Sequence, residues 1–326
     1  MIKRCVLGID GGATKTACLL SDNAGKIIGQ GVGGPSNPNL VNSDDIVTAV
    51  YEAISGAIRS SSVPEFKIEA LCAGIAGVGE EETQHRMRSL ICQVIDNFDA
   101  DTRYKGLFAR GMQIEVHTDA IISLVAGTGK RHGIVVISGT GSIIYGERSG
   151  DKTARAGGWG NFLDSEGSGY EIGMMALRAI MRAYDGRDHP TLLTEIILKE
   201  LNCITPAEMV SHVLRKTPAV TEIAGLARLV NVTAKSGDMV AMHILTNAAE
   251  ELCKGVIAVA KQLSFTKENF SLVLTGGVLR NSDFVEKQLV RKIRQSVPMA
   301  IPMVLAEEEA KGAIILALEY TGMAKS

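Results

Sequence analysis

The chain has 326 residues, of which 46% are hydrophobic and 21% are charged, with 34 Lys and Arg against 36 Asp and Glu. A chain of this length exceeds the size at which a single hydrophobic core keeps growing, so two domains are expected. The balanced charge provides no cationic excess for nucleic acid or an anionic membrane, and 4% aromatic residues provide few surfaces for base stacking.

Signals for export or membrane insertion are not found. A strand pattern begins almost at Met1, which leaves no room for a signal peptide, and no uncharged apolar run approaches the roughly 20 residues that span a bilayer. The 6 cysteines are scattered, mostly between apolar residues and without a Cys-x-x-Cys pair, so we expect buried free thiols. We therefore expect a cytoplasmic protein with no nucleic-acid or membrane partner and no transition-metal site.

The first predicted element is a hairpin from Cys5 to Lys26, CVLGIDGGATKTACLLSDNAGK. Apolar β-branched runs on both sides of a glycine-rich bend are typical of paired strands. The bend carries Asp10, Gly11, Gly12, Thr14, Lys15 and Thr16. Glycines let backbone N–H groups approach a ligand closely, and the hydroxyls and the amine add donors, so phosphate is the ligand best suited to this turn.

A loop and a helix are predicted next. Gly29 to Pro38 is too rich in Gly and Pro for a regular element, and Ser43 then begins a helix. Asn37, before Pro38, has both a donor and an acceptor, which suits a sugar hydroxyl, but an Asx-turn is an equally good interpretation of the residues alone.

Two predicted strands end in segments of possible function. The strand from Lys67 to Ala73 runs into small residues, Gly74 to Gly79, which lie close either to a ligand or to packed backbone. The strand from Gln113 ends at Asp119, where a helix begins. An aspartate at such a junction is most often an N-cap, and the helix dipole is expected to keep it ionised. His117 alternates with apolar residues in this strand and is predicted to be structural.

The segment from Gly133 to Lys152, GIVVISGTGSIIYGERSGDK, repeats the plan of the first hairpin. Its turn contains Gly139, Thr140 and Gly141, and a polar turn at Ser149–Asp151 follows. Two hairpins built alike indicate a duplicated unit with two phosphate loops. The turn is not a Rossmann fingerprint, because Ile144 stands where the third glycine is required.

The second half is mostly helical. Gly158 and Trp159, the only tryptophan, precede Asp164 and Ser165; Trp159 either stacks on a sugar or belongs to the core. Helical periodicity extends from Tyr170 to about Gln262. A buried strand then reaches Gly276 and Gly277, where backbone can approach a planar base closely, and Ala310 to Leu318 is predicted as a closing helix.

Six segments occur in the order typical of one family: GIDGGATKT, GPSNP, VHTDA, ISGTGS, GGWG with EGSGY, and LTGGV. Together they resemble the BadF/BadG/BcrA/BcrD ATPase family, particularly its N-acetylglucosamine kinase branch, within the acetate and sugar kinase, Hsp70 and actin superfamily. The resemblance implies an α/β fold of two ribonuclease H-like (actin-like ATPase) domains with a cleft between them and a helical insertion in the second. The domains would be 1–119 with 308–326, and 120–307, in a homodimer.

The resemblance also implies an activity: transfer of phosphate from ATP, with Mg²⁺, to the 6-hydroxyl of an amino sugar, most simply N-acetylglucosamine. Asp119 would be the general base, and Asp10 would be oriented toward the metal. Both turns would bind phosphates and the Gly276–Gly277 pair the adenosine. The implied sugar ligands are Asn37, Gly158, Trp159, and Asp164 or Ser165.

At one position the chain departs from its relatives, which usually read Gly-Asp-Glu-Gly-Ser where this chain has Asp164-Ser165-Glu166. The acidic sugar contact therefore falls on Ser165, with an aspartate one residue earlier. Alternatives are a kinase of N-acetylmuramic acid or glucosamine, an ATPase activator of an acyl-CoA dehydratase, and a sugar sensor without turnover. The activator would need closely placed cysteines, and a sensor would not need Asp119 as a base.

Overall fold

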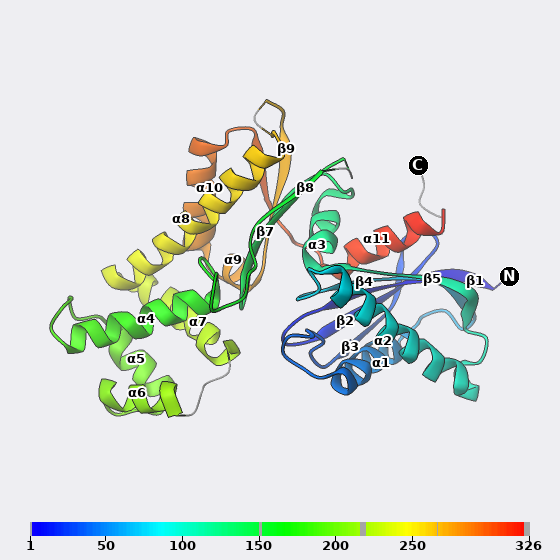
Figure 1. Cartoon of the computed structure of the whole chain (residues 1–326), viewed down its shortest axis with the longest axis horizontal. Helices are drawn as coiled ribbons and strands as arrows, with labels where there is room; N and C mark the ends of the chain where they lie inside the picture. Colours follow the sequence, from blue (N-terminus) through cyan, green and yellow to red (C-terminus); the bar gives the residue numbers. More distant parts are fainter. Residues whose placement is uncertain (1, 150–151, 216–219, 266, 323–326) are drawn as a thin grey trace. The chain divides into compact units, whose positions relative to one another are not determined.

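The computed structural model describes residues 2–149, 152–215, 220–265 and 267–322 (Figure 1). The predicted turn at Ser149–Asp151 thus lies partly outside the described residues. The chain forms two compact units: unit 1 is Met1–Arg131 with Leu305–Ser326, and unit 2 is His132–Val304.

Unit 1 is built on a five-stranded sheet in the order β3-β2-β1-β4-β5. Its strands are β1 (Lys3–Gly11), β2 (Thr16–Asp22), β3 (Ile27–Gly33), β4 (Phe66–Ile75) and β5 (Phe108–Thr118). β1, β2 and β3 pair antiparallel, whereas β1, β4 and β5 pair parallel. The helices of this unit are α1 (Ser43–Arg59), α2 (Glu81–Ala100), η1 (Thr102–Tyr104), α3 (Asp119–Thr128) and α11 (Ala310–Tyr320).

Both faces of this sheet are covered, which explains the unbroken apolar run of β1. Leu7 belongs to the core beneath α1 and α2, whereas Val6 belongs to the core beneath α3 and α11. A parallel strand buried on both faces requires apolar residues at successive positions. The closing helix α11, red in Figure 1, lies against the blue strand β1, and a Cβ on Gly8 would be 2.6 Å from the Ala310 carbonyl oxygen.

Strand β3 corrects the prediction that Gly29 to Pro38 contains no regular element, because residues up to Gly33 pair with β2. Its glycines fit the helix packed over it. A Cβ on Gly29, Gly31 or Gly33 would lie within 2.1 Å of a carbonyl oxygen of α1. The three oxygens belong to Ala57, Ala53 and Ala49, respectively. Every second residue of the strand therefore faces every fourth residue of the helix, and the backbones approach as closely as glycine allows.

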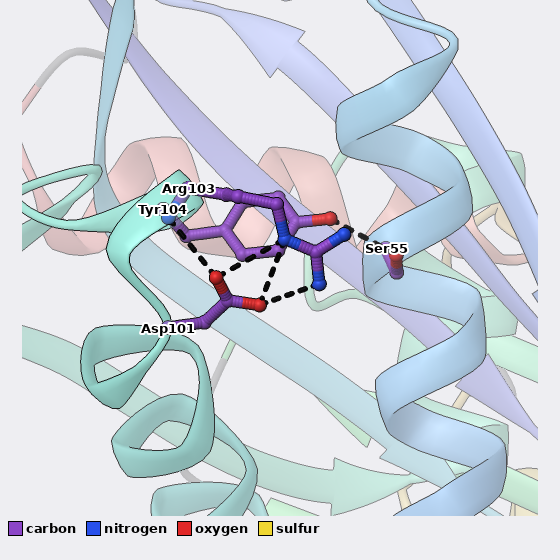
Figure 2. Close-up of polar contacts among 4 residues, drawn as sticks. All are labelled: Ser55, Asp101, Arg103 and Tyr104. Carbon is purple, nitrogen blue, oxygen red and sulfur yellow. Dashed lines mark hydrogen bonds and ion pairs between the residues drawn. The ribbon is translucent and has the colours of Figure 1, made fainter.

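The connection from α2 to β5 is fixed by polar and aromatic contacts (Figure 2). Asp101 accepts the Arg103 backbone N–H at 3.0 Å and forms an ion pair with its guanidinium at 2.6 Å. The Tyr104 hydroxyl lies 3.5 Å from Ser55 Oγ of α1, and its ring meets Phe98 of α2 edge-on at 5.0 Å. These contacts join the connection to both helices just before β5, the strand that leads to Asp119.

Unit 2 repeats the topology of unit 1, which confirms the predicted duplication. Its sheet has the order β10-β9-β6-β7-β8. The strands are β6 (Gly133–Ser138), β7 (Ser142–Arg148), β8 (Lys152–Gly157), β9 (Phe270–Thr275) and β10 (Ala300–Val304). β6 pairs antiparallel with β7 and parallel with β9, as β1 pairs with β2 and β4. The predicted α/β fold class is therefore confirmed.

The predicted helical insertion is also confirmed and lies between β8 and β9. It comprises α4 (Gly169–Tyr184), α5 (Leu193–Glu200), α6 (Pro206–Arg215), α7 (Val220–Lys235) and α8 (Met239–Gln262), and α9 (Gly277–Asn281) and α10 (Asp283–Ser296) follow β9. Buried apolar residues of α4, α7 and α8 form one core with the sheet. Within the described ranges, no helix combines the length and apolarity needed to cross a membrane.

Candidate active site

The first predicted phosphate turn is a tight bend held from two sides. Gly11 pairs with Thr16, and the Gly12 N–H donates to the Lys15 carbonyl at 3.0 Å. The Gly12 carbonyl in turn accepts the Ser36 N–H at 3.1 Å. Thr14 and Lys15 at the tip are exposed. Their side chains are therefore available to a ligand.

Thr16, in contrast, is fully buried. Its hydroxyl lies 2.7 Å from the Gly34 carbonyl oxygen and 2.8 Å from Ser36 Oγ, within hydrogen-bonding distance of both. A Cβ on Gly11 would lie 2.3 Å from the same Ser36 Oγ. Thr16 and Gly11 thus anchor the bend to the segment that leads to Asn37, whereas Thr14 and Lys15 form its open edge.

Asn37 makes the Asx-turn that the sequence left as one alternative. Its Oδ1 accepts the Asn39 N–H at 2.9 Å. The predicted small-residue segment lies directly against it, because a Cβ on Gly77 would be 2.5 Å from Asn37 Oδ1. Gly77 has φ of 87°, so glycine is favoured there on conformational grounds as well. The Asn37 NH₂ group would be the donor offered to a ligand.

Asp119 is the first residue of α3, and its Oδ1 accepts the Ala120 N–H at 3.0 Å. Burial raises its pKa to about 6; the backbone N–H groups of Ala120 and Asp119 oppose this shift, and the nearby Glu309 carboxylate adds to it. Desolvation therefore outweighs the stabilisation expected from the helix terminus. A carboxylate with a pKa near neutrality is a better proton acceptor than an ordinary aspartate.

Strand register places these unit 1 residues at one edge of the sheet. Gly11 pairs with Ile75, and Ile75 pairs with Thr118, so β1, β4 and β5 end side by side. The Ala76 N–H also donates to the Gly11 carbonyl at 2.8 Å. The carboxyl edge of parallel strands is the usual ligand site of such sheets. Asp119, the phosphate turn and the segment around Gly77 all start from this edge.

The second predicted phosphate turn packs on the start of α4. The Gly139 N–H donates to the Gly141 carbonyl at 2.9 Å, and the Gly139 carbonyl accepts the Gly169 N–H at 2.8 Å. The Thr140 carbonyl accepts the Tyr170 N–H at 3.2 Å. The turn and the helix N-terminus thus form one structure, with Thr140 half-buried at its tip.

Gly276 and Gly277 lie beside this second turn. Gly276 has φ of 97°, and a Cβ on it would be 2.3 Å from the Ser138 carbonyl oxygen. A Cβ on Gly139 would be 3.8 Å from the Gly277 nitrogen. Unit 2 therefore brings together the glycine turn that the sequence assigned to phosphate and the glycine pair that the family resemblance assigned to adenosine.

Trp159 lies at the surface rather than in the core. Its side chain is 62% exposed, and the Arg155 guanidinium carbon lies 3.7 Å from the ring centroid. Both neighbours have positive φ, 76° at Gly158 and 93° at Gly160. Glycine is favoured at both positions, and the indole presents one ring face to Arg155.

Asp164 and Ser165 differ in whether a buried side-chain oxygen is left without a hydrogen-bond partner. Asp164 Oδ2 is buried and has no hydrogen-bond partner among the described residues. Burial, together with the hydrogen bond and the charge of Glu166, raises the pKa of Asp164, and the Trp159 backbone N–H and Arg155 oppose the shift. Ser165 is 5% exposed, and its N–H donates to Glu166 Oε2 at 3.1 Å. A Cβ on Gly157 would lie 3.3 Å from Asp164 Oδ2, so that carboxylate is directed at the end of β8.

Residues outside the candidate site have structural roles. His117 Nε2 lies 2.6 Å from the Tyr320 hydroxyl, and burial lowers the pKa of His117. Cys5, Cys18, Cys72 and Cys253 are buried free thiols, and Cys92 and Cys203 are half-buried. In the part of the chain that the structure describes, no three His, Cys, Asp or Glu side chains form a metal-binding group.

Comparison with known proteins identifies the family. The sequence profile of the BadF/BadG/BcrA/BcrD ATPase family matches residues 7–317. The chain belongs to this ATPase family. It is 33% identical over 312 residues to the N-acetylmuramic acid/N-acetylglucosamine kinase of Clostridium acetobutylicum, covering 96% of this chain and 97% of that protein. It is 31% identical over 328 residues to the N-acetyl-D-glucosamine kinase of Dictyostelium discoideum, covering 98% and 99%.

The fold of this BadF/BadG/BcrA/BcrD ATPase is also found in a solved structure. An N-acetylglucosamine kinase candidate from Chromobacterium violaceum superposes with a TM-score of 0.74 at 24% identity, covering 97% of this chain and 99% of that chain. Family membership confirms the resemblance drawn from the six motifs and makes ATP the nucleotide.

Several site residues were missed by sequence reasoning. Ser36 was within the quoted GPSNP motif, but its contacts with the first turn join residues far apart in the sequence. Arg155 lies two residues before the quoted GGWG motif and Glu166 is the first residue of EGSGY, but only the structure shows their influence on Trp159 and Asp164. Thr118 precedes Asp119 and looked like an ordinary strand residue.

Proposed function

We propose that this BadF/BadG/BcrA/BcrD ATPase is a kinase that transfers the γ-phosphoryl group of ATP to the 6-hydroxyl of N-acetylglucosamine. The position of Asp119 carries the proposal: a carboxylate with a pKa of about 6 stands at the sheet edge where the first phosphate turn ends. Two sugar kinases at 33% and 31% identity over nearly the whole chain support the substrate class.

In the proposed mechanism, Asp119 accepts the proton of the sugar hydroxyl as its oxygen attacks the γ-phosphorus, and ADP leaves. Thr14 and Lys15 of the first turn, and Thr140 and Gly141 of the second, would donate to phosphate oxygens, whereas the N–H groups of Gly12 and Gly139 close the turns themselves. Phosphoryl transfer depends mainly on positioning and charge stabilisation, so a base of moderate strength is sufficient.

A magnesium ion fits this set of residues. Mg²⁺ in kinases is held by one or two carboxylates together with phosphates and water, so a preformed cage of acids is not required. Asp10, at the end of β1 beside the first turn, is the carboxylate that we assign to this role. When bound, Mg²⁺ neutralises charge on the β- and γ-phosphates.

The remaining residues bind the substrates. Gly276 and Gly277, with φ of 97° at Gly276, allow the adenosine to approach the backbone. Asn37, Gly158, Trp159 and Asp164 hold the sugar. Asp164 is favoured over Ser165 because its Oδ2 is buried without a partner in the described residues, whereas Ser165 is almost fully covered. Apolar side chains exposed on the helical insertion, such as Met239 at 74%, provide a surface for the proposed homodimer.

A coupled ADP-release assay tests the proposal, with N-acetylglucosamine, N-acetylmuramic acid, glucosamine and glucose as acceptors. N-Acetylmuramic acid is included because one relative is named for both N-acetylated sugars. We expect N-acetylglucosamine to give the highest kcat/KM. Rapid sugar-independent ATP hydrolysis would instead favour the activator alternative, and sugar binding without ADP release would favour a sensor.

Asp119→Asn should lower sugar-dependent kcat by about 10²- to 10⁴-fold while leaving ATP binding nearly unchanged. The matched control is Asp283→Asn. Asp283 also begins a helix, but its side chain is 72% exposed and pairs with the exposed Lys287 at 3.7 Å. Full activity in Asp119→Asn would remove Asp119 from the mechanism.

A further inference from the structure

Thr118 has a buried hydroxyl that the fold does not use. Its Oγ1 has no hydrogen-bond partner among the described residues. Thr118 is the N-cap of α3, with φ of −71° and ψ of 153°, yet its side chain makes no capping bond. A threonine at this position normally accepts an N–H from the first turn of the helix. Buried polar atoms are nearly always paired, so an unpaired one indicates a missing partner.

The position of Thr118 indicates what that partner contacts. Thr118 pairs with Ile75, which pairs with Gly11, so these three residues form a row across the carboxyl edge of the sheet. Residues paired in such a row leave the sheet on the same face. A Cβ on Gly11 would meet both Ile75 Cδ1 at 2.5 Å and Ser36 Oγ at 2.3 Å. Thr118 therefore shares its face of the sheet with the Ser36–Asn37 segment.

The chemistry of these neighbours favours a neutral polyhydroxylated ligand. Thr118 adjoins the carboxylate of Asp119, which repels phosphate at the same position. The hydroxyl of Thr118 and the amide of Asn37 are uncharged groups that both donate and accept. A sugar hydroxyl likewise donates and accepts, and so matches them.

We propose that the Thr118 hydroxyl binds the 4-hydroxyl of the acceptor sugar, the ring hydroxyl nearest to C6, and so selects the configuration at C4. The assignment rests on the proposed kinase function. It places two adjacent residues on two adjacent oxygens of one substrate: Asp119 on the reacting oxygen and Thr118 on the next. N-Acetylgalactosamine, the C4 epimer, is therefore a poor substrate.

The test is a cycle of enzyme variants and substrate analogues. Thr118→Val keeps the shape of the side chain and removes the hydroxyl, and Thr118→Ser is the matched variant that keeps it. With N-acetylglucosamine, Thr118→Val should lower kcat/KM about tenfold to a hundredfold, since a buried partner is left unpaired, whereas Thr118→Ser should stay within about threefold of wild type.

The 4-deoxy analogue provides the readout that a structural role would not change. For the wild type, kcat/KM should be lower with the 4-deoxy analogue than with N-acetylglucosamine, by about the same tenfold to hundredfold factor. For Thr118→Val, kcat/KM should be the same with both sugars. Either of two results would overturn the inference. One is an equal kcat/KM of Thr118→Val and wild type with N-acetylglucosamine. The other is a drop in the kcat/KM of Thr118→Val on the 4-deoxy sugar as large as the drop seen for the wild type.

Two further results complete the test. If Thr118→Val does not fold, as judged by thermal unfolding, Thr118→Ala takes its place in the same cycle with the same expectations. A wild type inactive on every amino sugar would overturn the proposed function together with this inference, whereas an active wild type with an indifferent Thr118→Val overturns the inference alone.

Discussion

Asp119→Asn should make the protein more stable near neutral pH while it removes activity. In the folded protein, burial raises the pKa of Asp119 from 3.8 to about 6, so the native state disfavours its charged form. Asn is uncharged at every pH, and its side-chain oxygen can still accept the Ala120 N–H. The substitution therefore removes the desolvated charge and keeps the contact that begins α3.

The size of the effect follows from the shift. One pKa unit corresponds to 1.36 kcal/mol, so a shift from 3.8 to about 6 corresponds to about 3 kcal/mol. Because the folded pKa is the higher one, the native state binds the proton more tightly than the unfolded chain. The stabilising contribution is complete below pH 3.8 and is lost as the pH rises through about 6. Above that range, the free energy of unfolding of Asp119→Asn should exceed that of the wild type by up to about 3 kcal/mol.

Denaturant unfolding of wild type and Asp119→Asn at several pH values between about 4.5 and 8 measures this difference, and other titrating groups cancel in the comparison. The gap should close toward the acidic end. In the same range, wild-type kcat/KM for the sugar should fall tenfold per pH unit below about 6, as the base becomes protonated. A stability difference that is constant with pH, or a wild type more stable than the variant at pH 8, would refute the assignment of a desolvated carboxylate with a raised pKa to this position.

Three other substitutions test the fold and the candidate sugar site. Gly31→Ala should lower the free energy of unfolding by about 1–3 kcal/mol, because the new Cβ would lie 2.1 Å from the backbone of α1. Gly34→Ala, whose Cβ would have its nearest contact at 3.8 Å, is the control in the same denaturation experiment. Equal stabilities of the two variants would contradict this packing. Asp164→Asn should reduce kcat/KM for the sugar at least about tenfold and Ser165→Ala less than about threefold, and the reverse order in the kinase assay would assign the contact to Ser165. Trp159→Leu should raise the sugar KM about tenfold without changing the ATP KM; since Trp159 is the only tryptophan, sugar titration should also change wild-type intrinsic fluorescence, and an unchanged spectrum would place the sugar elsewhere.

The duplicated plan could be predicted from the sequence because its signals are local. A glycine-rich bend between two β-branched runs specifies a hairpin wherever it occurs, and two such bends at Gly11 and Gly139 specify two hairpins. The helical insertion was equally accessible, since its apolar periodicity continues through α8. Each of these elements is encoded within its own residues.

Strand β3 could not be predicted in the same way because its stability comes from a distant helix. Three alternate glycines are unfavourable in an isolated strand, and they become favourable only when α1 packs on them through small residues. The match between Gly29 and Ala57, and between Gly33 and Ala49, was present in the sequence as spacings of two and four. Neither spacing identifies the other element without the fold.

The candidate sugar site was only partly predictable for a related reason. Sequence pattern locates a residue along the chain, but it does not reveal which polar atoms the fold leaves unpaired. Among the described residues, two buried side-chain oxygens have no partner: Thr118 Oγ1 in unit 1 and Asp164 Oδ2 in unit 2. Both lie within or beside a segment that the family motifs assign to sugar binding, one next to Asp119 and the other next to Ser165. An unpaired buried oxygen lowers stability, so a fold that keeps one in each candidate sugar segment gains most from a ligand rich in hydroxyl groups.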